Sequence, residues 1–228
     1  MRQVLFLSFI AVCGFFISGS VAAEDTYTEE VTIIAEVADL AGAGAVISNE
    51  DLQKAMDTDI QKILTAVPGL YMRTEEGYGL RPNISIRGTA IERSAKVTIM
   101  EDGVLVAPSP YTSSSAYYFP TTGRIHAVEV LKGPNALLFG RGGEGGLIHR
   151  VSKRAIVGES FTNVDVGYDS LGSGDFTVDG NMQLSDTVAL RLMAHSDTLS
   201  NHRDQYDGDR FGINPSFTFA LNEATELN

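Results

Sequence analysis

The chain has 228 residues, of which 43% are hydrophobic, and a formal charge of −12 at pH 7. This length allows one or two domains, and the acidity excludes nucleic-acid binding through the overall electrostatic field. The single cysteine is Cys13. Because it lies in the N-terminal leader, the rest of the chain can form neither a disulfide framework nor a cysteine-based metal site.

Residues 1–23 have the order of a secretory signal peptide. Arg2 supplies a positive start, an almost unbroken apolar run extends from Val4 to Ile17, and small residues end the leader at Ala23. The run is shorter than the roughly 20 residues that a membrane-spanning helix needs. Cleavage after Ala23 is therefore favoured over a membrane anchor.

Residues 24–36 contain one short β-prone segment directly after the leader. It consists of Val31, Thr32, Ile33, Ile34 and Ala35. The segment is either the first strand of the following domain or an extended peptide that adds as a strand to the sheet edge of another protein. The residues alone leave both interpretations open.

Residues 37–154 predict a domain of small helices and short strands. Ser48 is the expected cap of a first helix, and Thr58 or Asp57 is the expected cap of a second one. The second helix ends at Pro68-Gly69. Its apolar face consists of Ile60, Ile63, Leu64 and Val67, which have helical spacing.

The same domain then changes to a period of two. Asp102-Gly103 is a strong hairpin signal between two of its strands. A helix of barely two turns is expected from Pro134 to Phe139. The glycines of 140–146 lack the order of a phosphate-binding loop, so they predict tight turns beside close neighbours. Strands are expected at 70–74, 84–87, 97–101, 104–106 and 125–131, with loops at 75–81 and 107–122.

Residues 155–228 alternate apolar and polar side chains over segments of about 8–11 residues, which is typical of transmembrane β-barrel strands. The alternative is a soluble antiparallel sandwich with one wet face. Charged and amide residues in the inward set, together with the leader, favour the barrel. Leu184–Thr187 is expected to be a short turn and Asp197–Arg210 a long polar loop. The segments are Phe161–Tyr168, Phe176–Leu184, Val188–Ala194 and Phe211–Leu221.

About four strands cannot close a barrel. A barrel around a plugged lumen has about 22 strands, whereas only 74 residues follow Arg154. We therefore expect an α+β domain with a short mixed β-sheet, followed by the first antiparallel strands of an incomplete transmembrane barrel, in a fragment of a longer protein.

Taken together, these motifs resemble the TonB-dependent outer-membrane receptors of the ferric siderophore and ferric citrate type. VTIIA resembles a TonB box, and NEDLQKAMDTDIQKILTAVPGL resembles the start of the plug domain. NISIRG, VTIMEDGVLV and VEVLKGPNALLFGRGGEGGLIHRVSKR resemble the central plug motifs. The resemblance covers essentially the whole chain.

The resemblance implies a monomeric receptor in the outer-membrane lipid of a Gram-negative bacterium. It would import a ferric chelate into the periplasm, with Val31–Ala35 bound by TonB and no cofactor of its own. It also implies that Arg87 and Lys132 meet acidic groups on the barrel wall. Lys132 stands where the family often has arginine, so the bidentate fork is absent there.

Ligand contacts are expected in the outward loops of the plug. An anionic chelate would favour Arg81 and Arg93, with Tyr111, Tyr117 and Tyr118 as flat amphipathic contacts. The four histidines lack metal-ligand spacing. The plug motifs equally fit cobalamin, a nickel chelate or an oligosaccharide as cargo. A surface or periplasmic β-sheet protein with a structural or adhesive role is the alternative of another class, and no nucleophile motif indicates an enzyme.

Overall fold

The computed structural model describes residues 44–55, 59–73, 82–106, 120–133, 139, 144–200, 207–222 and 225–228. The expected signal peptide, the segment at 24–36, the loops at 74–81 and 107–119 and most of the helix expected from Pro134 lie outside these residues. Within the described ranges, no helix is both long enough and apolar enough to cross a membrane.

The elements follow one another in this order: β1 (Gly44–Ile47), α3 (Asn49–Ala55), α4 (Ile60–Leu64), β2 (Leu70–Arg73), β3 (Asn83–Ile86), the 3-10 turn η1 (Glu92–Ser94), β4 (Val97–Glu101), β5 (Val104–Leu105), the 3-10 turn η2 (Thr122–Arg124), β6 (Ile125–Lys132), β7 (Gly146–Ser152), β8 (Phe161–Tyr168), β9 (Gly174–Ser185), β10 (Val188–Ser200), β11 (Asp207–Asn222) and β12 (Thr225–Leu227).

Five of the strands form a mixed sheet, which we call the N-terminal sheet. Its order is β1-β6-β7-β4-β5, and β2 and β3 form a separate pair. β4 and β7 run parallel, whereas the other neighbours are antiparallel. The expected short mixed sheet with small helices is therefore confirmed.

Both faces of the N-terminal sheet are buried at its central strands β4, β6 and β7. Val97, Ile99 and Ile148 join one apolar cluster with residues of α3, α4 and the β2–β3 pair. Met100, Leu131 and Leu147 form a second cluster. Because successive strand residues point to opposite faces, the consecutive buried residues of β4, β6 and β7 show that these strands are covered on both sides.

The two helices begin close to where the sequence places them. Ser48 caps α3 as expected, because its Oγ accepts a hydrogen bond from Asp51 N at 3.2 Å. The expectation of Thr58 or Asp57 as the cap of α4 is wrong. The cap is Asp59, whose carboxylate accepts from Gln61 N at 2.8 Å. The buried face of α4 matches the prediction, and Val67 continues it beyond the end of the helix.

Two turns depend on left-handed backbone conformations. Asp102 (φ 47°) and Gly103 (φ 81°) make the hairpin between β4 and β5, as predicted. The expected strand at 84–87 is one residue too long, because Arg87 has φ 52° and already belongs to the turn after Ile86. Close packing is also confirmed at Gly146, where a Cβ would collide with the carbonyl oxygen of Leu131.

The remaining strands form an antiparallel sheet in the order β12-β11-β10-β9-β8, which we call the C-terminal sheet. β9, β10 and β11 are longer than expected, whereas β8 has the expected bounds. The prediction of a loop over Asp197–Arg210 is wrong for residues 197–200 and 207–210, which belong to β10 and β11. Asp197 and Arg210 are cross-strand partners, and Arg210 Nε donates to Asp197 Oδ2 at 2.6 Å. Asp197 can belong to a strand because it lies on the face of the sheet that buries polar side chains.

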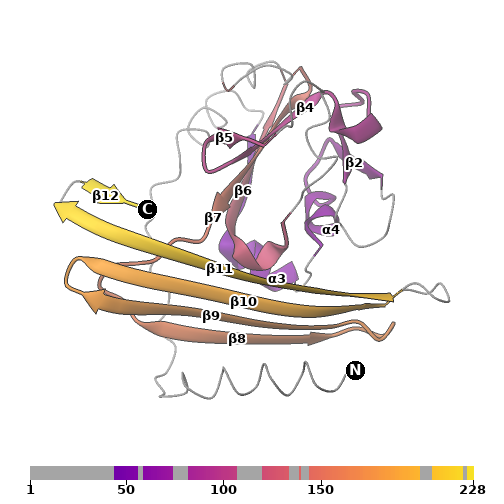
Figure 1. Ribbon diagram of the computed structural model, residues 1–228. Helices are drawn as coiled ribbons and strands as arrows, with labels where there is room; N and C mark the ends of the chain where they lie inside the picture. Colours follow the sequence, from indigo (N-terminus) through magenta and orange to yellow (C-terminus); the bar gives the residue numbers. More distant parts are fainter. Residues whose placement is uncertain are drawn as a thin grey trace.

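The two faces of the C-terminal sheet have opposite chemistry. One face buries polar side chains, whereas the other exposes apolar ones. The N-terminal sheet stands over the polar face, which we call the inner face (Figure 1). A soluble sandwich would bury its apolar faces together, so this arrangement contradicts that alternative. The buried polar set is Thr177, Asp179, Asn181, Arg191, His195, Asp197 and Thr218, and the exposed apolar set includes Val164, Val166, Phe211, Ile213, Phe217, Phe219 and Leu221.

Candidate functional site

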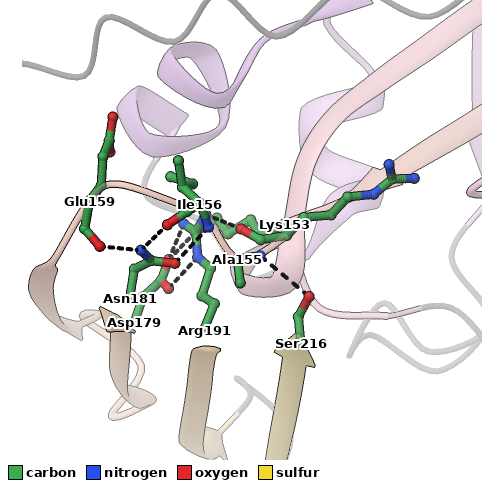
Figure 2. A network of polar contacts seen from close by, with 9 residues as sticks. Lys153, Ala155, Ile156, Glu159, Asp179, Asn181, Arg191 and Ser216 are labelled. Carbon is green, nitrogen blue, oxygen red and sulfur yellow. Dashed lines mark hydrogen bonds and ion pairs between the residues drawn. The ribbon is translucent and has the colours of Figure 1, made fainter. Parts of the chain in front are cut away.

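The candidate site is the interface between the inner face and the segment that joins the two sheets. This connecting segment, residues 153–160, leaves β7 and passes over β9, β10 and β11 before it enters β8. Its backbone is held there by side chains of the C-terminal sheet (Figure 2). Backbone groups away from water must find partners, and here the inner face supplies them.

Asn181 of β9 binds the connecting segment on both sides of its amide. Its Oδ1 accepts from Ile156 N at 2.9 Å. Its Nδ2 donates to the carbonyl oxygens of Ile156 and Glu159, at 2.9 and 2.8 Å. Figure 2 shows this amide between the carbonyl oxygens of Ile156 and Glu159. The side chain of Asn181 therefore holds the backbone of the connecting segment from Ile156 to Glu159.

β11 contributes two hydroxyl groups to the same segment. Ala155 N donates to Ser216 Oγ at 3.4 Å, and Thr218 Oγ1 donates to Ala155 O at 2.6 Å. Farther along the segment, Gly158 N donates to the side chain of Gln183. The segment is thus held from two strands that are not adjacent in the sheet, because β10 lies between β9 and β11.

The charged centre of the interface is a bidentate ion pair within the C-terminal sheet. Arg191 Nε and NH2 donate to the two carboxylate oxygens of Asp179, each at 2.8 Å. Lys153 Nζ of the connecting segment also reaches Asp179, at 3.0 Å. Both Asp179 and Arg191 are buried. Buried bidentate pairs are strong and directional, so this pair fixes where Lys153 lies.

Arg191 also contacts the connecting segment directly. Its NH1 donates to the carbonyl oxygen of Arg154 at 3.1 Å. The guanidinium carbon lies 5.1 Å from the ring centroid of Phe161, the first residue of β8. Arg191 therefore contacts residues near both ends of the connecting segment, and a cation–π contact of this kind adds modest further attraction.

A second contact between the two parts lies at η2. A side chain at Gly123 would touch Met193 and Thr177 of the inner face, at 3.7 and 3.8 Å from its Cβ. The next residue, Arg124, forms an ion pair with Glu101 of β4. Burial lowers the pKa of Arg124, but an arginine remains charged. A Cβ at residue 123 would make ordinary van der Waals contact there, so η2 lies directly against the inner face.

Inside the N-terminal sheet, His149 links three strands. Gly103 N donates to His149 Nε2 at 3.0 Å, so Nδ1 carries the proton and donates to Glu129 Oε2 at 2.8 Å. The histidine is thereby committed to the β4–β5 hairpin and to β6. Among the described residues, no group of three or more His, Cys, Asp or Glu side chains could hold a metal ion.

Comparison with known proteins assigns this architecture. A model of the TonB-dependent Receptor Plug Domain family matches residues 36–147. The chain belongs to the TonB-dependent receptors. The N-terminal sheet and its helices are the plug domain, and the C-terminal sheet has the place of the first wall strands.

The relatives among curated proteins are receptors of this family. The chain is 30% identical over 195 residues to the probable TonB-dependent receptor BfrD of Bordetella pertussis, covering 85% of this chain and 25% of that protein. It is 28% identical over 198 residues to the catecholate siderophore receptor Fiu of Escherichia coli O157:H7, covering 84% and 24%. The chain thus spans about a quarter of the length of these relatives.

Solved structures agree. The open form of the ferric-catecholate import receptor Fiu from E. coli K12 matches with a TM-score of 0.64 and 25% identity, covering 80% of this chain and 25% of that one. The siderophore receptor PiuA from Acinetobacter baumannii matches with the same TM-score at 27% identity, covering 80% and 25%. The ferric citrate transporter FecA matches with a TM-score of 0.67 at 22% identity, covering 83% of this chain and 30% of FecA, and so shares the fold.

The structure brings together the two plug residues predicted to meet the barrel wall. A Cβ at Gly69 would lie 3.8 Å from both Arg87 Cγ and Lys132 Cδ. Lys132 Nζ donates to Pro68 O at 3.2 Å. Arg87 is exposed. Their meeting with acidic wall groups remains a prediction.

Of the five predicted ligand contacts, the structure describes one. Arg93 is exposed and has φ 50°, and its backbone N donates to Asn83 Oδ1 at 2.6 Å. The next residue, Ser94, accepts a hydrogen bond at its Oγ from Ile84 N at 2.9 Å. The turn at Arg93 is therefore fixed by hydrogen bonds to Asn83 and Ile84 of β3. Arg81, Tyr111, Tyr117 and Tyr118 lie outside the described residues, as do Val31–Ala35.

Sequence reasoning missed the residues that hold the connecting segment, namely Lys153, Asp179, Asn181 and Arg191. A signal for three of them was available, since charged and amide side chains at inward positions of alternating strands require partners. The sequence does not show which partner each one takes.

Proposed function

We propose that the protein is an outer-membrane receptor that imports a ferric chelate into the periplasm and whose plug is moved by TonB. The observation that carries this proposal is a plug domain placed on the buried polar face of a sheet whose opposite face is apolar and exposed. An apolar outer band over a polar interior is what a lipid-embedded barrel requires.

The names of the relatives support an iron cargo. Fiu is a catecholate siderophore receptor, and PiuA is a probable siderophore receptor. Catecholate chelates of iron are anionic, and the exposed cation Arg93 on a turn fixed by Asn83 and Ser94 suits an anionic ligand. In this proposal Arg81, Tyr111, Tyr117 and Tyr118 supply further contacts.

The convergence of Arg87 and Lys132 supports the role proposed for them. The aliphatic stems of the two side chains lie beside the same glycine, so both cationic side chains leave the plug from neighbouring positions. Acidic groups on the barrel wall could then pair with both of them. Together with the left-handed backbone at Arg87, this arrangement favours a strained contact that can be released when the plug moves.

Deletion of the gene, followed by measurement of radioactive ferric-catecholate uptake under iron limitation, tests the cargo. Loss of uptake, restored by the intact gene, is the expected result. Unchanged iron uptake, with a growth defect on cobalamin, nickel or an oligosaccharide instead, would assign another cargo to the same machine.

Ile33→Pro tests the TonB contact separately. Proline removes one hydrogen bond from an added strand, so energised uptake should be lost while the ligand still binds at the cell surface. Ile33→Val preserves the strand and is the matched control. Uptake that survived in Ile33→Pro would remove Val31–Ala35 as the site of TonB binding.

A further inference from the structure

The connecting segment and the N-terminal elements of the plug are held by different partners. The N-terminal elements β1, α3 and α4 bury Ile47, Leu52, Ile60, Ile63 and Leu64 in the apolar core of the plug itself. The connecting segment instead gives its backbone groups to Asn181, Arg191, Ser216 and Thr218 of the wall. The two ends of the plug therefore depend on different partners.

This difference affects how each end can move. Apolar contacts are non-directional. An element that is packed by them can therefore move together with the plug core or away from it. The bidentate Asp179–Arg191 pair and the two-sided amide of Asn181 are directional. These side chains bind the backbone of residues 154–159 in one register. If the connecting segment slid along the sheet, several of these hydrogen bonds would break together.

We propose that Asp179, Asn181 and Arg191 form a docking site for the connecting segment, which keeps the C-terminal end of the plug seated on the wall and thereby keeps the barrel sealed. Arg191 is the central positioning residue, because it hydrogen-bonds to Asp179 and to Arg154 O and its guanidinium lies over the ring of Phe161. The docked segment stays fixed while the opposite end of the plug is pulled. The proposal rests on the proposed function only in treating the C-terminal sheet as part of a membrane barrel.

Arg191→Met in the receptor, as its own cells produce it, is the first test. It keeps an unbranched apolar stem but removes the guanidinium group, and with it the bonds to Asp179 and Arg154 O. Sensitivity to vancomycin, a large hydrophilic antibiotic that an intact outer membrane excludes, should rise severalfold because the plug seats loosely. The amount of receptor in the outer membrane and its heat-modifiable migration show that the barrel has formed.

Arg210→Met is the matched control. Arg210 also pairs with a buried carboxylate on the inner face, since its Nε donates to Asp197 Oδ2 at 2.6 Å. That pair joins β10 and β11 rather than the connecting segment. Vancomycin sensitivity should therefore remain at the wild-type level in Arg210→Met. Equal sensitivity in both variants would overturn the docking role of Arg191.

A disulfide can replace the docking site. Ala155 N lies 3.4 Å from Ser216 Oγ, so residues 155 and 216 are neighbours, and residues 24–228 contain no cysteine. The pair Ala155→Cys with Ser216→Cys therefore tests whether a covalent link between the connecting segment and β11 can take over. Added to Arg191→Met, the oxidised pair should restore exclusion of vancomycin, and reduction should abolish it again. A leak that persisted after oxidation would overturn the proposal.

The same disulfide in the otherwise wild-type receptor tests whether the segment stays fixed, and it decides the question even if Arg191→Met fails to assemble. Uptake should be equal in the oxidised and reduced forms. Uptake lost on oxidation and regained on reduction would show that the segment must move, which contradicts the proposal. Vancomycin entry requires no knowledge of the cargo, so failure of the iron assignment and failure of the docking site remain distinguishable.

Discussion

The two sheets of this receptor distribute buried and exposed side chains in different ways. In the N-terminal sheet, β-branched residues such as Val97, Ile99 and Ile148 are buried, and the buried charged residues Glu129 and Arg150 bond to partners in the same sheet. In the C-terminal sheet, Asp179 and Arg191 are buried, whereas Phe211 and Ile213 are exposed. Inside and outside are therefore defined by what surrounds each sheet and not by polarity alone.

The difference teaches that stability has separate sources in the two regions. The plug gains it from apolar area removed from water. The wall sheet is joined to the plug by hydrogen bonds and ion pairs. Each such bond stabilises the contact modestly, but removing one of its two partners costs much more. Mutations should consequently have different signatures in the two sheets.

The largest effect is expected from Asp179→Ala. The change leaves Arg191 and Lys153 without their carboxylate in a buried site, which costs about 3–5 kcal/mol. Urea unfolding of the purified receptor in detergent measures the loss. The double change Asp179→Leu with Arg191→Met should cost less than the single one, because no buried pair remains to be broken; an equal or larger loss would show that the ion pair itself stabilises the wall.

A charge on the outer face should have the next largest effect. Phe217 is exposed on β11, and arginine facing lipid near the middle of a bilayer costs about 2–4 kcal/mol. Phe217→Arg should reduce the amount of receptor assembled in the outer membrane. Asn214→Arg, on the inner face of the same strand, is the control and should assemble better. The reverse ranking would mean that the apolar face does not contact lipid.

A smaller effect is expected where the plug backbone is packed most tightly. Gly146 has φ 149°, and a Cβ there would collide with the carbonyl oxygen of Leu131. Gly146→Ala should destabilise the plug by about 1–3 kcal/mol through overpacking, measured by protease sensitivity or hydrogen exchange of β6 and β7. Gly158→Ala is the control, since Gly158 also has positive φ (94°) but nothing within 4 Å of its Cβ.

The smallest effect concerns the cap of α3. The Ser48 side chain hydrogen-bonds to Asp51 and, as the largest cause, lowers the pKa of that carboxyl. A lowered folded-state pKa gives stability that is present above the ordinary aspartate pKa of about 3.9 and is lost as the pH falls through the folded value. Ser48→Ala should therefore speed hydrogen exchange in α3 at neutral pH, and the difference from wild type should shrink in acid. A difference independent of pH would assign the effect to the lost Ser48 Oγ–Asp51 N bond alone.

The sequence by itself determined the features that depend on neighbours in the chain. The helical spacing of Ile60, Ile63 and Leu64, the Asp102-Gly103 hairpin and the alternation in β9 to β11 each reflect local backbone geometry, and the structure has all of them. The family could also be recognised, because its motifs are short, contiguous and in a fixed order.

Only the tertiary structure decided which distant residues meet. Asp197 to Ser200 and Asp207 to Arg210 have the polarity of a loop, but they continue β10 and β11 because the two segments pair with each other residue by residue. Likewise, the arrangement of the strands makes Arg191 a partner of Asp179 and of the connecting segment. A polar side chain in a sequence shows that a partner is needed, whereas the partner's identity depends on the chain path that places the plug over the wall.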